Sequence, residues 1–173
     1  MSEIRAVAER AKSAARALAS LGTEEKKGLL MAMADGLTAQ EKKIRKANEE
    51  DVAAARAAGT SGALLDRLEL TQKRFQEMVE GVRQVAKLPD PVGEVMKRWT
   101  RPNGLEIFKV RVPIGLIGII YESRPNVTVD SAVLCLMAGN ATLLRGGREA
   151  KRSNRVLADV LGEVAHQKGL PKE

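Results

Sequence analysis

Apolar residues recur at helical spacing through the first ninety residues of the chain. Four such stripes run from Ile4 to Leu18, Leu29 to Leu37, Ile44 to Ala55 and Phe75 to Val85. Glycine follows the first and third stripes, and threonine precedes the second and fourth, as expected at helix ends and helix starts. The pattern predicts amphipathic helices with charged outer faces, which we group as an N-terminal helical part, residues 1–90.

The next segment loses this spacing. The run Leu88-Pro89-Asp90-Pro91 breaks the helical pattern, and two further segments, 94–100 and 105–112, flank the dipeptide Asn103-Gly104. Asn-Gly supports the positive backbone angles of a tight hairpin turn. Residues 91–112 are therefore predicted to form a β-hairpin, which is marginally stable alone.

Residues 114–121 (IGLIGIIY) form a short, β-branched apolar run. Such a run is typical of a strand buried on both faces of a parallel sheet. Gly115 and Gly118 weaken a strand unless a backbone or a ligand approaches closely. The polar residues 122–130 are predicted to form a loop, because Pro125 keeps Arg124 out of the helical region.

A helix and a second strand are predicted to complete a β-α-β crossover. The helix covers Ser131 to Met137 and stops at Gly139-Asn140, and the strand covers Ala141 to Arg145. A loop, 146–149, leads to a helix from about Ser153 to Lys168, whose first amides can face an anion. Strand ends, glycines and arginines thus meet where open α/β sheets bind ligands, so residues 113–173 read as a phosphate-binding part.

The composition narrows the class of partner. The chain has 29 lysines and arginines against 22 acidic residues, a net charge of +7, which suits anionic substrates, phosphorylated cofactors or nucleic acid. Aromatic residues make up only 2%, so stacking platforms are nearly absent and nucleic acid is not expected. No run is long enough to span a membrane, and a single cysteine excludes an intramolecular disulfide. We expect a cytoplasmic protein.

Several segments carry a close resemblance to one family: 112–128 (VPIGLIGIIYESRPNVT), 139–147 (GNATLLRGG), 47–52 (ANEEDV), 65–71 (LDRLELT) and 90–93 (DPVG). Together they resemble the gamma-glutamyl phosphate reductases, or glutamate-5-semialdehyde dehydrogenases, of the aldehyde dehydrogenase superfamily. The resemblance implies an α/β fold: N-terminal helices, a hairpin of an oligomerisation arm, and the first βαβ part of a Rossmann-like nucleotide-binding domain. It implies an NADP-dependent oxidoreductase of proline biosynthesis that reduces L-glutamyl 5-phosphate with NADPH to L-glutamate 5-semialdehyde and phosphate.

The resemblance also assigns roles to residues. Asn126 stands where the superfamily has the asparagine that donates a hydrogen bond to the oxyanion. By residue type alone, the alternative for Asn126 is a turn or cap residue. Arg124 is expected to bind the phosphate or carboxylate of the substrate through its bidentate fork.

The cofactor is expected to contact a second group of residues: Pro125, Arg145, Gly146, Gly147 and Arg148. Relatives that prefer NAD often carry a glutamate at the position of Arg148, and a guanidinium there attracts the 2′-phosphate of NADP instead. Glu149 is the next residue in the sequence, so the glutamate of the NAD-preferring relatives can correspond to either position 148 or position 149. Both arginines are otherwise ordinary exposed cations.

None of these residues is the nucleophile that the reaction of the family requires. Cys135 lies in an apolar helix, where a thiol is usually an inert packing group. In the family, the catalytic cysteine belongs to a later domain, so we expect an N-terminal portion that is inactive without its C-terminal portion. Its expected partner is a second copy, in a homo-oligomer, or a complementing C-terminal chain. His166 is assigned no catalytic role, and no metal site is expected.

Two alternatives remain. One is a noncatalytic binding or oligomerisation module derived from this family. The other is part of a different aldehyde dehydrogenase-like enzyme, against which the loop 122–126 (ESRPN) argues, since common relatives carry a shorter element there.

Overall fold

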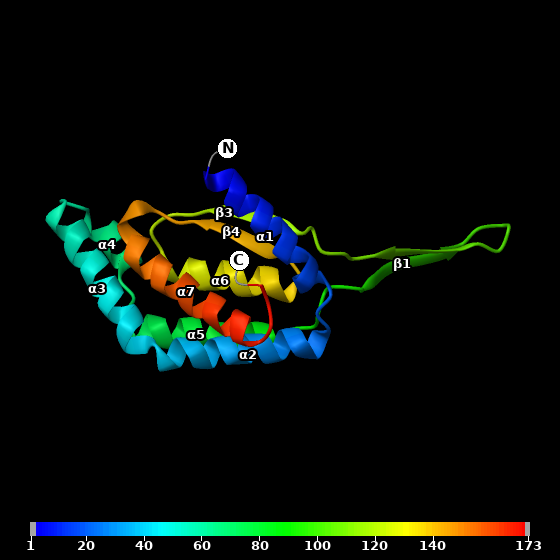
Figure 1. Ribbon diagram of the computed structural model, residues 1–173, viewed down its shortest axis with the longest axis horizontal. Helices are drawn as coiled ribbons and strands as arrows, with labels where there is room; N and C mark the ends of the chain where they lie inside the picture. The colour runs from blue at the N-terminus through cyan, green and yellow to red at the C-terminus, as the bar shows by residue number, and fades with distance from the viewer. Residues whose placement is uncertain (1–2, 172–173) are drawn as a thin grey trace.

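The computed structural model describes residues 3–171 and shows an α/β protein with a projecting hairpin (Figure 1). The helices and strands follow one another as α1 (Glu3–Ala19), α2 (Thr23–Ala39), α3 (Glu41–Ala57), α4 (Gly62–Leu68), α5 (Gln72–Lys87), β1 (Val95–Thr100), β2 (Glu106–Val110), β3 (Leu116–Ile120), α6 (Pro125–Met137), β4 (Ala141–Arg145), a 3-10 turn η1 (Arg148–Ala150) and α7 (Lys151–Gln167). No helix among residues 3–171 is long and apolar enough to cross a membrane. The predicted α/β fold class is confirmed.

The helices pack in layers around the parallel strand pair β3 and β4. Helix α1 contacts both strands, α6 packs on β4 with α7 alongside it, and α2 and α5 lie beyond α6 (Figure 1). One hydrophobic core joins α2 and α5 to α6 and α7, with Leu30, Leu37, Val82, Val129 and Leu157 fully or almost fully buried. The predicted helical part and the predicted phosphate-binding part therefore share a core, and their boundaries stay a prediction.

The four predicted N-terminal helices are present, with one short helix that the sequence did not predict. Thr71 caps α5, because its side chain accepts a hydrogen bond from the Arg74 amide at 3.2 Å. The additional helix, α4, spans seven residues and buries only Leu68. Two turns with one buried side chain are too short to show a helical period.

Helix α6 begins at Pro125 and not at Ser131, so the predicted loop 122–130 is wrong from Pro125 onward. Proline suits the first position of a helix, where its missing N–H would have no partner. Arg124 is extended, with φ −122° and ψ 101°, as the following proline requires. The polar Thr128 is buried in this helix, where its hydroxyl contacts Tyr121 at 2.7 Å and Asn154 at 2.9 Å.

Strand β3 is less buried than its sequence predicts. Ile114 and Ile120 are 81% and 84% exposed, so the prediction of a strand buried on both faces is wrong for the described chain. The reason is that, among residues 3–171, β3 pairs only with β4, in a sheet of two strands. Gly115 has φ +112°, which explains the glycine, whereas a side chain at Gly118 would meet no atom within 4 Å.

The predicted hairpin is confirmed as the antiparallel pair β1 and β2, which extends away from the helices (Figure 1). Gly104 has φ +84°, as the turn requires. Every side chain of β1 is exposed, including Trp99, and so is Phe108 on β2. The arm therefore buries little against its own chain.

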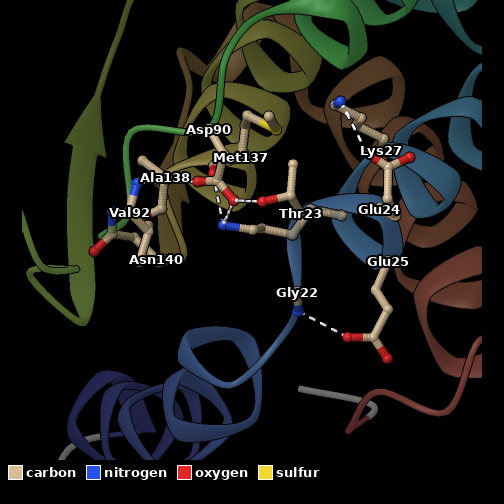
Figure 2. Close-up of polar contacts among 11 residues, drawn as sticks. Gly22, Thr23, Glu24, Glu25, Lys27, Asp90, Val92, Met137, Ala138 and Asn140 are labelled. Atoms are coloured by element: carbon tan, nitrogen blue, oxygen red, sulfur yellow. Dashed lines mark hydrogen bonds and ion pairs between the residues drawn. The ribbon is translucent and has the colours of Figure 1, made fainter. Parts of the chain in front are cut away.

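A buried ion pair fixes the root of this arm. The Nζ of Lys26, a side chain only 2% exposed, lies 2.5 Å from Oδ2 of Asp90 and 3.3 Å from the Met137 carbonyl. Asp90 also accepts hydrogen bonds from Thr23 and from the Val92 amide, as Figure 2 shows. Burial alone would raise the pKa of Asp90, but these bonds hold the pKa below its usual value. The pair joins α2 to the end of α6 and to the segment that starts the arm.

Candidate functional site

A cavity of about 480 Å³ opens between α5, the segment before it and the start of α6. Arg124, Pro125 and Asn126 line it together, alongside Arg67, Arg74 and Asp130. Three residues that the sequence singled out thus meet in one pocket. Arg67 and Arg74 were missed as site residues, although Arg67 lies within one of the segments that carry the family resemblance.

Asn126 lies in the first turn of α6, and its side chain is already oriented. Its Nδ2 donates a hydrogen bond to Oδ2 of Asp130, one helical turn later, at 3.1 Å. An amide nitrogen carries two hydrogens, so the second N–H remains for another acceptor. Burial raises the pKa of Asp130, against the opposing effect of the Asn126 hydrogen bond.

Arg124 brings an unmatched donor to the pocket. Its Nε is buried and has no hydrogen-bond partner in the described chain, while Nη2 lies 3.6 Å from the Glu122 carboxylate. Glu122 accepts a shorter bond from Arg67, at 2.8 Å. A buried donor without a partner is costly, and an anionic ligand would satisfy it.

Arg74 is held within the protein. Its Nη2 lies 3.0 Å from each oxygen of Asp66, and Nη1 donates to the Glu69 carbonyl at 3.1 Å. This bidentate pair fixes the segment between α4 and α5, so Arg74 shapes the wall of the pocket.

The expected cofactor residues lie at the carboxyl ends of the two parallel strands, because Arg145 stands opposite Ile120 in the sheet. The side chains of Arg145 and Arg148 are exposed. The two glycines pack tightly: a Cβ on Gly146 would lie 2.2 Å from Asn154, and one on Gly147 would lie 2.9 Å from the Ser123 amide. Glycine is thus required to bring the loops after β3 and β4 together.

Ser123 also ties these two loops by a side-chain bond. Its hydroxyl donates a hydrogen bond to the Glu149 carboxylate. This bond, with a smaller contribution from the charge of Arg148, holds the pKa of Glu149 below its usual value. The carboxylate next to Arg148 is therefore engaged with the loop after β3.

The first amides of α7 do face an anion, but that anion is Asp51 of the same chain. Asp51 accepts hydrogen bonds from the Ser153 amide at 2.7 Å and from its hydroxyl at 2.8 Å, and Asn48 donates to the same hydroxyl at 3.1 Å. The sequence pattern did not predict this buried cluster. A signal existed, because Asn48 follows Ile44 by four residues and so lies on the apolar stripe of α3.

The remaining candidates lie away from the pocket. Cys135 is partly buried in α6, and burial raises the pKa of its thiol, which disfavours the thiolate. His166 contacts the Leu170 carbonyl at 3.3 Å. Within residues 3–171, no group of three histidines, cysteines or acids is placed to hold a metal ion.

Comparison with known proteins identifies the family. The model of the aldehyde dehydrogenase family matches residues 1–173. The gamma-glutamyl phosphate reductase of Moorella thermoacetica is 54% identical over 170 residues, covering 98% of this chain and 41% of the relative. That of Geobacillus sp. (strain WCH70) is 50% identical over 173 residues, covering all of this chain and 42% of the relative.

Solved structures agree. The crystal structure of gamma-glutamyl phosphate reductase from Thermotoga maritima matches 99% of this chain and 41% of its own, with a TM-score of 0.94 and 43% identity. The Saccharomyces cerevisiae enzyme matches with a TM-score of 0.94 and 33% identity, covering 99% of this chain and 45% of its own. This chain thus spans about two fifths of the relatives' length. It belongs to the aldehyde dehydrogenase family, as a relative of its gamma-glutamyl phosphate reductases.

Proposed function

We propose that this chain forms the N-terminal portion of an NADPH-dependent reductase that converts L-glutamyl 5-phosphate to L-glutamate 5-semialdehyde and phosphate in proline biosynthesis. The observation that carries the proposal is the pocket where Arg124, Pro125 and Asn126 meet at the start of α6. The identity to gamma-glutamyl phosphate reductases over nearly the whole chain supports it.

In this proposal Asn126 stabilises the charge that develops on the acyl oxygen of the substrate. Its second N–H is the donor, and the bond to Asp130 holds the amide in place. A preorganised donor of this kind lowers a barrier by roughly 3 kcal/mol. The buried Nε of Arg124 binds the phosphate or the carboxylate of the substrate.

The nucleophile is a thiol other than Cys135. A thiolate attacks the acyl phosphate carbon, the carbon–oxygen bond to phosphate breaks, and phosphate leaves with the electron pair. NADPH, when bound, would supply the hydride that reduces the resulting thioester. The carbon–sulfur bond then breaks, which releases the aldehyde and returns the electron pair to the thiolate. Cys135 is a poor candidate because burial raises the pKa of its thiol. Turnover therefore requires a portion of the enzyme beyond these residues.

The cofactor is NADP in this proposal. Arg145 and Arg148 are exposed cations at the carboxyl ends of parallel strands, which suits a 2′-phosphate. Glu149, the carboxylate that would repel it, bonds to Ser123. Gly146, Gly147 and Pro125 complete the expected contacts. We keep the cytoplasm as the expected compartment.

The exposed arm of β1 and β2 supports a second element of the proposal, a partner chain that covers the arm. Trp99 and Phe108 are exposed on it, and an isolated hairpin is marginally stable. A homo-oligomer would bury these side chains. The same observation favours the alternative of a noncatalytic oligomerisation module, which the following assay separates.

The test uses what we call the completed enzyme: this chain combined, in trans or by fusion, with the unmatched portion of the Moorella thermoacetica relative. Oxidation of glutamate 5-semialdehyde in the presence of phosphate is measured with NADP and with NAD. We expect turnover with a preference for NADP, and loss of that preference in Arg148→Glu. If no turnover is seen, the noncatalytic oligomerisation module is favoured. If propionaldehyde is turned over as fast as glutamate 5-semialdehyde, another aldehyde dehydrogenase-like enzyme is favoured.

A further inference from the structure

The pocket beside Asn126 is lined by a partly buried carboxylate that lacks a cationic partner in the described chain. Asp130 is partly buried, and its side-chain hydrogen bond comes from the neutral amide of Asn126. No cationic side chain within residues 3–171 forms an ion pair with it. Burial also raises its pKa, as expected for a desolvated carboxylate that lacks a cation.

Two other acids of the pocket are already paired. Asp66 forms its bidentate pair with Arg74 at 3.0 Å, and Glu77 lies 3.8 Å from Lys73. These two carboxylates have cationic partners within the protein. Glu69 also lines the pocket without an ion pair among residues 3–171, but it is exposed, whereas Asp130 is partly buried. Arg124 brings an unmatched group of opposite charge to the same pocket, because the buried Nε of Arg124 lacks an acceptor.

A ligand that carries both an ammonium group and an anionic group would satisfy both unmatched groups. We propose that Asp130 binds the α-ammonium group of an amino-acid substrate and so selects substrates that retain the amine. The assignment rests on the function proposed above, and it adds a specificity-determining residue to the same pocket. Charge-assisted hydrogen bonds of this kind discriminate strongly, because an analogue without the amine leaves the carboxylate unpaired.

The spacing along α6 suits this role. Asp130 lies four residues after Asn126 on the same side of the helix, and its Oδ2 is 3.1 Å from Nδ2 of Asn126. In a glutamyl group, the reacting acyl carbon and the amino nitrogen are separated by four single bonds of about 1.5 Å each. A substrate whose acyl oxygen meets Asn126 can therefore reach Asp130 with its amine.

The experiment compares two substrates in the completed enzyme: glutamate 5-semialdehyde and 5-oxopentanoate, which lacks only the amine. In the wild type, kcat/KM should favour the amine by at least about tenfold. Asp130→Asn keeps an oxygen that can accept the Asn126 bond but removes the charge. It should lower kcat/KM for glutamate 5-semialdehyde by at least about tenfold and leave 5-oxopentanoate within about twofold.

Glu80→Gln is the matched control, because Glu80 is an exposed carboxylate on α5, 3.9 Å from Arg83, outside the pocket lining. It should leave both substrates unchanged. Asp130→Ser gives the same readout if Asp130→Asn does not fold.

The outcomes separate the two proposals. An unchanged substrate preference in an active Asp130→Asn enzyme overturns the ammonium assignment alone. An equal loss for both substrates also overturns it, because Asp130 would then act through Asn126. If the wild type fails to turn over glutamate 5-semialdehyde, the proposed function falls and the assignment falls with it.

Discussion

At the scale of single residues, Asn126 offers the sharpest test of the proposed chemistry. In the completed enzyme, Asn126→Ala removes the N–H that would meet the acyl oxygen, while the rest of α6 is kept. We expect kcat to fall about 100- to 1,000-fold, because the lost donor acts mainly in the transition state. Steady-state kinetics measure the fall, and Asn103→Ala in the hairpin turn is the control. Turnover within about threefold of wild type would remove Asn126 from the mechanism.

Asp90 gives a residue-scale prediction about stability and pH. Asp90→Asn leaves Lys26 buried without a counter-charge, so the free energy of unfolding at pH 7 should fall by about 3 to 5 kcal/mol. The folded state lowers the pKa of Asp90 from 3.8. The ion pair therefore stabilises fully above this value and loses its contribution as the pH falls below it.

Urea unfolding at several pH values measures this difference. The gap between wild type and Asp90→Asn should narrow as the pH drops below about 4. Asp35→Asn is the control, because Asp35 forms an exposed pair with Arg83 at 3.4 Å and should change stability by less than about 1 kcal/mol. A gap that is absent at pH 7 would contradict the role of the pair.

Part of the candidate site, at the start of α6, could be predicted from the sequence. Arg124, Pro125 and Asn126 follow from the family resemblance, and they do line one pocket. The sequence does not link Asp130 to Asn126, because their contact exists only if the helix begins at Pro125, and the polar pattern predicts a loop there. Arg67 comes from a segment 55 residues away from its partner Glu122, a proximity that no local pattern encodes.

At the scale of elements, the buried Asn48 connects α3 to the wall of the pocket. It donates to the Leu68 carbonyl at 2.9 Å and accepts from the Leu70 amide at 2.7 Å. Asn48→Ala leaves the Leu68 carbonyl and the Leu70 amide buried and unpaired, so the free energy of unfolding should fall by about 1 to 3 kcal/mol. Hydrogen exchange should accelerate at the Leu70 amide and stay unchanged in α2. Protection of Leu70 equal to wild type would refute this account.

The arm gives a second prediction about an element. If β1 and β2 form an interface, the double change Trp99→Ala and Phe108→Ala removes its largest apolar side chains. Sedimentation should then show a dissociation constant raised by at least about tenfold. Leu64→Ala on α4 is the control, because Leu64 is similarly exposed and lies outside the arm. If the double variant and Leu64→Ala have the same dissociation constant, the interface lies outside the arm.

The elements differ in how well sequence alone predicts them. The long helices α2, α3 and α5 repeat their buried positions over several turns, and β1 and β2 flank an Asn-Gly turn, so both patterns were readable. Helix α6 was predicted too short because its first turn is polar yet packed: Thr128 is buried by contacts from other segments. The burial of β3 depends on neighbouring strands, which its own sequence does not report.

At the scale of the whole molecule, the chain contains a pocket wall with the side-chain amide of Asn126, and two parallel strand ends with exposed arginines at and beyond them. In the described part of the chain the parallel sheet has two strands, and both Ile120 in β3 and Ile114 before it are exposed. The relatives are more than twice as long. Our central claim is that this chain contributes binding and charge stabilisation, and that the nucleophile is a different thiol from Cys135.

One measurement tests that claim most directly: NADP-dependent oxidation of glutamate 5-semialdehyde with phosphate, by this chain alone and by the completed enzyme. We predict no turnover by the chain alone and turnover by the completed enzyme that persists in Cys135→Ser. Activity of the chain alone that disappears in Cys135→Ser would contradict the account and make Cys135 the nucleophile.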